Sequence, residues 1–246
     1  WKPDYGPSEM DVKRGATVIG ARNFLIAYNV NLNTTSTRRA NAVAFDVREA
    51  GRVMREGNKP SGKPLLNADG TPKIQPGSLK HVKAIGWFIE EYGIAQISMN
   101  LTDINETPLH RVFEEVCEKA RLRGLRVTGS ELVGLVPLQS LLDAGRYFLK
   151  QQQRSIGVSD AELIKIAVKT MGLNELAPFI PEQRIIEYKV NSSQTPNLIQ
   201  LNLKEFLELT ASESPAPGGG SVSAYLGALG AALSAMVANL SAHKKG

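Results

Sequence analysis

Two segments of the sequence alternate between apolar and polar residues, and this pattern constrains the fold more than any other feature of the chain. Residues 22–32 (RNFLIAYNVNL) and 96–102 (QISMNLT) predict strands, because side chains alternate between the two faces of a strand. The apolar side comprises Phe24, Ile26, Tyr28, Val30, Leu32, Ile97, Met99 and Leu101. The polar side comprises Asn23, Asn29, Asn31, Gln96, Ser98, Asn100 and Thr102. Each strand therefore has one side suited to a core and one uncharged, hydrogen-bonding side.

The segments around these strands predict further strands and helices. Apolar residues recur at helical spacing in residues 35–51 and 107–120. Residues 81–101 predict two strands that meet in a hairpin, and residues 125–137 contain another strand. The order β-α-β-β-α-β predicts an α+β fold of the ferredoxin-like type, with its helices on one face of the sheet. The first and third strands are then the adjacent central pair, so their polar sides lie together on the uncovered face.

Other segments extend this unit. Residues 55–80 are rich in glycine, proline and lysine and predict a long loop. Residues 138–149 and 160–171 predict helices, and residues 184–190 (RIIEYKV) predict a short strand. In the helix of residues 107–120 we expect Thr107 as the N-cap and Pro108 as the first helical residue.

A polar, turn-rich stretch divides the chain into two parts. The sequence NSSQTPN predicts a linker at residues 191–198, which separates a first domain at residues 1–190 from a second at residues 199–246. The second part contains a short helix and then a glycine run that enters an alanine-rich helix. The glycines of this loop permit positive φ, and Ser221 is the expected cap of a helix that begins by Val222. Free amides at such a helix start suit a carboxylate or phosphate.

Composition bears on the class of function. The net charge of +5 is spread along the chain rather than gathered in a stripe, which does not favour nucleic-acid binding. The single cysteine, Cys117, excludes an intramolecular disulfide and indicates a cytoplasmic, reducing compartment; we interpret it as a core residue. Three scattered histidines, His81, His110 and His243, show no metal-ligand spacing, so no metal is expected. Residues 222–242 are rich in small side chains, which favours packing against protein over a membrane span.

Three features are candidates for a functional site. The polar side of the sheet suits a ligand with amide-like edges, such as a pterin, and the alternative is an ordinary solvated face. Glu131 lies within an apolar strand, where its carboxylate either holds a cationic group or pairs with an arginine. His110 lies in the first turn of its predicted helix, where it is either an acid–base or ligand-contacting group or a surface residue without a role.

Several stretches resemble known families. The stretch PAPGGGSVSAYLGALGAALSAMV resembles the opening of formimidoyltetrahydrofolate cyclodeaminase, a helical family related to methenyltetrahydrofolate cyclohydrolases. In chain order, GATVIGARNFLIAYNVNL, TPLHRVFEEVCEKA and GSELVGLVPLQSLLDA resemble the C-terminal subdomain of glutamate formimidoyltransferase. The whole chain thus resembles an internal piece of the bifunctional formimidoyltransferase–cyclodeaminase family of histidine degradation. It opens on WKPDYGP, without a methionine, and we interpret it as cut at both ends.

The resemblance implies an activity and a set of partners. A formimino group passes from N-formimidoyl-L-glutamate to N5 of tetrahydrofolate, the co-substrate. The second domain of the family then releases ammonia and forms 5,10-methenyltetrahydrofolate. The family's folate tunnel lies between an N-terminal subdomain, which carries the catalytic histidine, and the C-terminal subdomain. We therefore expect this chain to supply binding groups but no catalytic residue, to pair with that N-terminal subdomain, to be inactive alone, and to form a homo-oligomer.

The resemblance also implies site residues and favours the polar face as a tunnel wall. The expected folate- or substrate-binding residues are Asn29, Asn31, Gln96, Ser98, Asn100 and Glu131. The expected cyclodeaminase glycine loop is Gly218, Gly219, Gly220 and Ser221. Two other functions stay open. One is a non-catalytic module that pairs with partner chains through its sheet. The other is an RNA-binding sheet, which the Asn, Gln and Ser side chains disfavour because base stacking needs aromatic residues.

Overall fold

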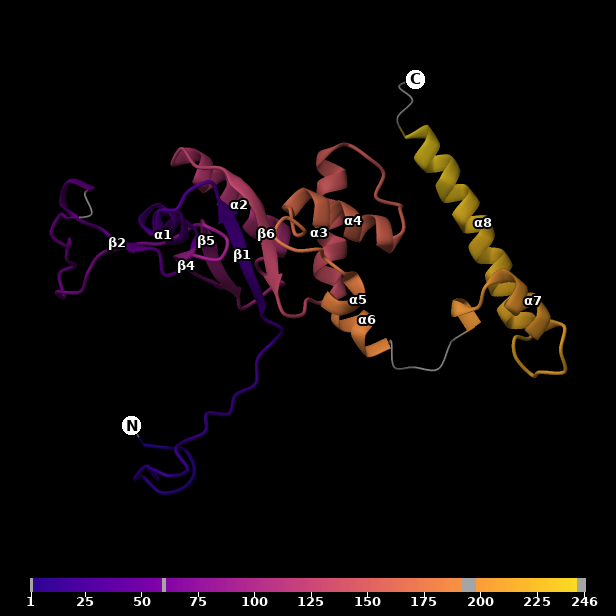
Figure 1. Ribbon diagram of the computed structural model, residues 1–246, viewed down its shortest axis with the longest axis horizontal. Coiled ribbons are helices and arrows are strands. Elements are labelled where there is room, and N and C mark those ends of the chain that lie inside the picture. Colours follow the sequence, from indigo (N-terminus) through magenta and orange to yellow (C-terminus); the bar gives the residue numbers. More distant parts are fainter. Residues whose placement is uncertain (1, 59–60, 192–197, 243–246) are drawn as a thin grey trace.

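Four antiparallel strands form a sheet in the order β4-β5-β1-β6 (Figure 1). The computed structural model describes residues 2–58, 61–191 and 198–242. The four strands are β1 (Ile26–Leu32), β4 (Val82–Ile89), β5 (Ile94–Leu101) and β6 (Val127–Val133). The strands β1 and β5 are adjacent at the centre of the sheet, which confirms the predicted central pair.

The pairing of β1 with β5 aligns the two apolar sides and the two polar sides. Tyr28 lies opposite Met99, and Asn31 lies opposite Gln96. The prediction for Phe24 was wrong, because β1 begins at Ile26 and the Phe24 side chain is 61% exposed. The physical reason is that β5 ends at Leu101, the partner of Ile26, so the earlier residues have no strand beside them.

Two helices cover one face of this sheet. Helix α1 (Thr37–Val47) begins after Ser36, whose side chain accepts a hydrogen bond from the Arg39 amide, and it packs on β4 and β5. Helix α2 (Leu109–Leu122) packs on β1 and β6. Its N-cap is Pro108 rather than Thr107, because the Thr107 hydroxyl donates to the Lys80 carbonyl at 2.7 Å. The apolar residues of both helices and the apolar side of the sheet form one core.

A helical pair follows the sheet. Helices α3 (Leu138–Gln151) and α4 (Asp160–Met171) pack against each other, and both were predicted. The end of α4 is fastened to the edge of β6, because the Ser130 hydroxyl donates to the Met171 carbonyl at 2.6 Å and the Ser130 amide donates to the Gly172 carbonyl at 3.0 Å. The position of α4 is therefore set by the sheet.

The strand predicted at residues 184–190 was wrong. These residues lie in α5 (Pro181–Arg184) and α6 (Ile186–Asn191), with an isolated bridge from Ile185 to Val136. The carboxylate of Glu187 accepts a hydrogen bond from the Leu138 amide at 2.8 Å, which satisfies a free amide at the start of α3. A helical turn places Glu187 at that point.

The predicted long loop at residues 55–80 contains part of a small arm. The arm pairs β2 (Arg52–Val53) with β3 (Ile74–Gln75) and includes the short 3-10 helix η1 (Glu56–Asn58). In Figure 1 the arm projects from the sheet on the side away from α3 and α4.

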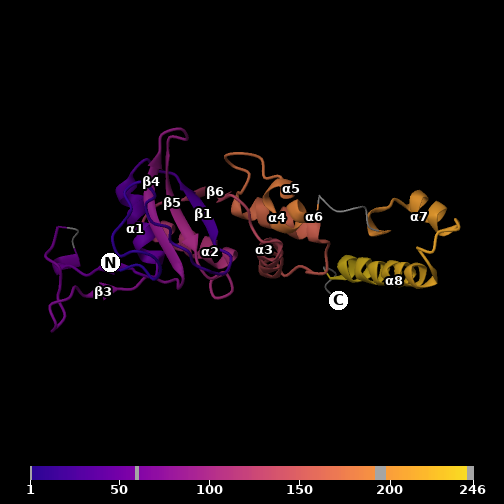
Figure 2. The same ribbon diagram turned by 90° about the horizontal axis from the view of Figure 1, so that it is seen from below.

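The C-terminal part is helical. It contains η2 (Leu198–Gln200), α7 (Leu203–Thr210), which is capped reciprocally by Asn202 and Glu205, and α8 (Gly219–Ser241). Figures 1 and 2 both show α7 and α8 at the end of the molecule remote from the sheet. Most of the predicted linker, residues 192–197, lies outside the described residues.

Among the described residues, α8 alone has the length and apolar composition that crossing a membrane requires, and none of its most apolar window is buried. Length and composition do not distinguish such a span from a helix that packs against protein.

Candidate functional site

Four of the predicted site residues form one hydrogen-bonded network on the sheet. The Asn29 side-chain amide donates to Glu131 Oε1 at 2.8 Å. The Gln96 amide donates to the same oxygen at 3.3 Å and to Asn31 Oδ1 at 2.8 Å. Three neighbouring strands, β5, β1 and β6, each contribute to this network, because the register places Gln96 opposite Asn31 and Asn29 opposite Glu131. We call Asn29, Asn31, Gln96 and Glu131 the polar network.

The polar network lies on the face of the sheet away from α1 and α2. On β4, Gly86 faces α1 so closely that an added Cβ would lie 2.2 Å from the Asn41 backbone nitrogen. Gly86 pairs with Ile97, which is buried in the core. Since neighbours along a strand point to opposite faces, Gln96 points away from the helices. This agrees with the predicted alternation.

Two residues join the polar network that were absent from the sequence-based prediction. The Trp87 indole donates to Gln96 Oε1 at 3.1 Å, and the Asn31 amide donates to Glu175 Oε2 at 2.8 Å. The hairpin register, in which Trp87 pairs with Gln96, is a signal that would have found Trp87. Glu175 follows α4, and no local pattern indicates that it reaches the sheet.

Two glycines allow Glu175 to reach this face. Gly172 ends α4 in the left-handed region, with φ +61°, and an added Cβ there would lie 2.8 Å from Gly129 Cα. An added Cβ on Gly129 would lie 2.6 Å from the Glu175 Cβ. Real side chains do not approach so closely, so the chain after α4 passes β6 at this point because both residues lack a Cβ.

The carboxamides of the polar network are buried although α1 and α2 lie on the other face of the sheet. Asn31 and Gln96 are 0% exposed and Asn29 is 4% exposed, whereas Glu131 is half-buried and Glu175 is exposed. Buried amides are stable when hydrogen-bonded, and these amides are bonded mainly to one another and to the two carboxylates. The network thus holds Glu131 in one orientation and leaves it part-exposed. A carboxylate held in this way can accept N–H groups of a ligand without first reorganising.

The other predicted residues of the face are less connected. Ser98 is half-buried opposite Asn29, and Asn100 is exposed opposite Ala27. By the register both lie on the same face as the polar network, farther along β5. The role of all six residues in binding stays a prediction.

The glycine loop differs from the expectation. Gly218 is the N-cap of α8 with φ −97°, and Gly219 and Gly220 are its first helical residues. Ser221 is therefore inside the helix rather than at its cap. An added Cβ would meet nothing within 4 Å at Gly219 or Gly220, so this conformation does not require glycine. The loop also lies far from the polar network, at the end of the molecule that holds α7 and α8 (Figures 1 and 2).

The remaining candidates have structural surroundings. His110 stacks on Tyr147 with ring centroids 4.4 Å apart, and burial lowers its pKa, while Asp143 acts in the opposite direction. Cys117 packs against the core as predicted, and burial raises its pKa to about 12. His81 is exposed, and His243 lies outside the described residues. Within the part of the chain that the structure describes, no group of three His, Cys, Asp or Glu side chains is arranged to hold a metal ion.

Comparisons with known proteins cover both parts of the chain. Residues 27–191 match the profile described as formiminotransferase domain, and residues 202–246 match the profile described as formiminotransferase-cyclodeaminase. Formimidoyltransferase-cyclodeaminase from Gallus gallus is 45% identical over 246 residues, and that from Dictyostelium discoideum is 42% identical over 247 residues. Each of these alignments covers 100% of this chain and 42% of the relative.

A relative with a different name matches part of the chain. Glutamate formimidoyltransferase from Thermoplasma acidophilum is 40% identical over 150 residues, which are 61% of this chain and 41% of that protein. The chain therefore spans about two fifths of the length of the relatives with which it aligns in full.

Proposed function

This chain belongs to the formiminotransferase family, and we propose that it forms one wall of a site in which a formimino group passes from N-formimidoyl-L-glutamate to tetrahydrofolate. The observation that carries the proposal is the polar network on the uncovered face of the sheet. Its residues lie inside the range that matches the formiminotransferase domain. The names of the aligned relatives support the same reaction.

The reaction needs orientation and proton transfer. The N5 lone pair of tetrahydrofolate attacks the formimino carbon, and a tetrahedral intermediate forms. N5 loses its proton, the bond from that carbon to the glutamate nitrogen breaks, and the glutamate nitrogen takes up a proton as it leaves. We assign the proton transfers to groups outside the polar network. The network orients a reactant, which lowers the entropic part of the barrier.

Within the network we assign binding of the reactant to Glu131. Its Oε1 accepts the amides of Asn29 and Gln96, which fixes the plane of the carboxylate. A planar carboxylate matches two parallel N–H groups, such as those of the 2-amino-4-oxo edge of a pterin or of a protonated formimino group. Asn29, Asn31, Gln96, Ser98 and Asn100 then line the face around the reactant.

For residues 202–246 we propose a place in a cyclodeaminase domain that converts 5-formimidoyltetrahydrofolate to 5,10-methenyltetrahydrofolate and ammonia. The apolar stripe of α8 supports this, because its large side chains are exposed and suit packing against further helices of a domain. The stripe comprises Leu226, Leu229, Leu233, Met236 and Leu240. In this proposal the glycine loop, Gly218 to Ser221, lies at the entrance of that second site.

Several finer points accompany the proposal. The two matched ranges support a first domain at residues 1–190, a linker at residues 191–198 and a second domain at residues 199–246. The strand order supports a ferredoxin-like sheet. The part-exposed Glu131 carboxylate on the face away from α1 and α2 supports a site that an N-terminal subdomain completes. A cytoplasmic location and a homo-oligomer are further proposals, and the absence of metal, nucleic-acid and membrane partners stays a prediction.

A chimeric enzyme tests the proposal. The 246 residues replace the aligned segment of the Gallus gallus relative, and formimino transfer to tetrahydrofolate is measured. We expect transfer by the chimera and a rise of about ten-fold in KM for one of the two reactants in the Glu131→Gln variant, because the carboxylate loses a charge-assisted pair. The control is Thr128→Val, an exposed position on the same strand. An unchanged KM for both reactants in Glu131→Gln would refute the assignment.

The alternative function predicts a different result. A module that pairs with partner chains through its sheet would self-associate, and folate would not change that association. Sedimentation of the 246-residue chain, considered together with formimino transfer by the chimera, separates the two: self-association of the chain without transfer by the chimera favours the module, and transfer by the chimera favours the proposed site.

A further inference from the structure

A cavity of about 470 Å³ lies outside the polar network, among the C-terminal ends of α1 and α2 and the root of the arm. Its lining includes Asp46 from α1, Arg52 from β2 and Arg123 from the end of α2. The chain that follows β3 closes another side with Gly77 and Ser78. Small-molecule sites in proteins have volumes in this range, from roughly 300 to 1,000 Å³.

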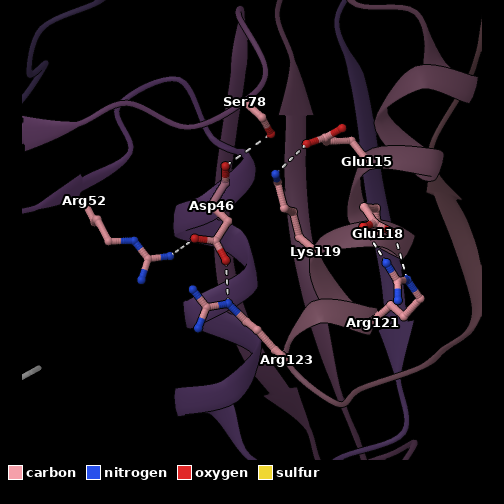
Figure 3. Close-up of polar contacts among 8 residues, drawn as sticks. All are labelled: Asp46, Arg52, Ser78, Glu115, Glu118, Lys119, Arg121 and Arg123. Carbon is pink, nitrogen blue, oxygen red and sulfur yellow. Dashed lines mark hydrogen bonds and ion pairs between the residues drawn. The ribbon is translucent and has the colours of Figure 1, made fainter. Parts of the chain in front are cut away.

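One carboxylate holds two arginine side chains at this cavity (Figure 3). Asp46 Oδ1 accepts from Arg52, which also donates to the Ala42 carbonyl at 2.9 Å. Asp46 Oδ2 accepts from Arg123 Nε at 2.5 Å. A guanidinium has five N–H donors, so each arginine has donors beyond those that Asp46 and Ala42 use. Asp46 thus fixes two cationic forks beside one cavity.

The charges at the cavity do not balance. Asp46 offers one negative charge to Arg52 and Arg123, and the ammonium of Lys119, also in the lining, is paired with Glu115 at 3.1 Å. Burial is the main cause that lowers the pKa of Arg52, and the neighbouring cations Arg123 and Arg48 act in the same direction. The site therefore carries an excess of positive charge in partly buried surroundings.

The walls of the cavity are already formed. The Ser78 amide and hydroxyl both donate to the Asp46 carbonyl, at 2.9 and 3.2 Å. An added Cβ on Gly77 would lie 2.1 Å from the Arg48 carbonyl oxygen, so this segment is seated tightly against the end of α1. The side chains of Asp46, Arg52 and Arg123 are 20%, 26% and 35% exposed, which leaves them accessible but ordered by their contacts.

We propose that this cavity binds a small anionic molecule whose phosphate or carboxylate oxygens accept the remaining N–H groups of Arg52 and Arg123. Planar guanidinium forks bind phosphate and carboxylate in a two-point geometry, and a partly buried cationic site strengthens that bond. The cavity is lined by the helices that cover the other face of the sheet, so this is a site in addition to the proposed formimino-transfer site.

A helix end also attracts cations without any ligand, and the chain offers a control for that effect. Lys119, Arg121 and Arg123 all lie in or beside the last turn of α2, where positive side chains favour the helix dipole. Arg121 is outside the lining of the cavity and pairs with Glu118 at 2.8 Å. Replacement of Arg121 therefore removes a charge of the same kind from the same helix end but leaves the cavity intact.

Calorimetric titration of the 246-residue chain tests the proposal, with inorganic phosphate and citrate as the two probes. We expect saturable binding of at least one probe, and tighter binding of phosphate or of citrate identifies the preferred oxyanion. Arg123→Gln should weaken binding by at least about ten-fold, and Arg121→Gln should leave it within about two-fold. Lys119→Gln is a second variant: it keeps both Asp46 contacts but leaves the Glu115 carboxylate unpaired beside the cavity, so binding of an anion should also weaken.

Three results would overturn the proposal. One is the absence of saturable binding for both probes. Another is an equal loss in Arg121→Gln and Arg123→Gln, which would mean that only the general charge of the helix end matters. The last is undiminished binding in Lys119→Gln together with Arg123→Gln, or in Lys119→Gln alone if Arg123→Gln does not fold.

Discussion

Replacement of Gly86 by alanine tests how closely α1 is seated on the sheet. An ideal Cβ at Gly86 would lie 2.2 Å from the Asn41 nitrogen and 2.5 Å from the Ala40 carbonyl carbon. Both are backbone atoms, so no side-chain rotation relieves the contact and α1 must move outward. That movement also threatens two hydrogen bonds: the Gly86 amide donates to Asn41 Oδ1 at 2.9 Å, and Asn41 Nδ2 donates to the Gly86 carbonyl at 3.1 Å.

The size of the effect follows from these contacts. Overpacking of a core costs about 1–3 kcal/mol. Each lost hydrogen bond adds about 0.5–1.5 kcal/mol, and alanine recovers about 0.5–1 kcal/mol of backbone entropy. We therefore expect Gly86→Ala to reduce the free energy of unfolding by about 1–5 kcal/mol, which lowers Tm by about 2–20 °C for a domain of this size.

Urea unfolding of the 246-residue chain, followed by circular dichroism, measures this change. The matched control is Gly157→Ala, where the added Cβ would meet Ser155 Oγ at an ordinary 3.6 Å. The control should keep or slightly raise the midpoint. If Gly86→Ala unfolds within about 0.5 kcal/mol of the parent with the same denaturant dependence, α1 does not lie on β4 as described.

Three other measurements probe individual groups. Burial lowers the pKa of His110, so the neutral imidazole stabilises the fold, and this contribution is complete above about pH 6.5 and is lost as the pH falls. Between about pH 7.5 and about pH 5, His110→Gln should therefore lose less of its free energy of unfolding than the parent chain does. Burial raises the pKa of Cys117 to about 12, so a disulfide reagent near pH 8 should react at least about 100-fold more slowly with the folded chain than with the chain in urea, and equal rates would contradict this. Ser159 Oγ accepts the Glu162 amide at 3.4 Å as the N-cap of α4, so Ser159→Ala should cost about 1 kcal/mol in the same urea assay, and an unchanged midpoint would exclude the cap.

Alternation predicted the sheet because its polar and apolar sides differ so sharply. A one-residue slip would expose Tyr28 and Val30 and bury Asn29 against the helices, so only one register is compatible with the sequence. The same reasoning located Asn29, Asn31 and Gln96 on one face, whereas Glu131 was a separate candidate that the pairing of β1 with β6 places beside them. Trp87 was within reach of this argument through the hairpin register, and Glu175 was not, because a tertiary crossing brings it there.

The local failures share a physical cause. Residues 184–190 form a short segment whose pattern does not distinguish strand from helix. Pro181 begins α5, and the contact of Glu187 with the start of α3 favours the helical turn of α6. Thr107 has the right side chain for an N-cap but is committed to the Lys80 carbonyl. At the glycine loop the N-cap is Gly218 rather than Ser221, so the helix begins three residues earlier than expected. In each case a contact with another part of the chain, or a shift of about one helical turn, set the secondary structure or the N-cap that the local sequence did not determine.

The contact of Gly172 with Gly129 joins two parts of the molecule mechanically. The chain leaves α4, crosses β6 and brings Glu175 to Asn31, so we expect a tilt of the α3–α4 pair to move the Glu175 carboxylate relative to the carboxamides of the polar network. A residue with a side chain at Gly129 or Gly172 would separate the chain after α4 from β6. The hydrogen bond from Asn31 to the Glu175 carboxylate would then be lost. The geometry of the polar network thus depends on how the α3–α4 pair packs beside the sheet.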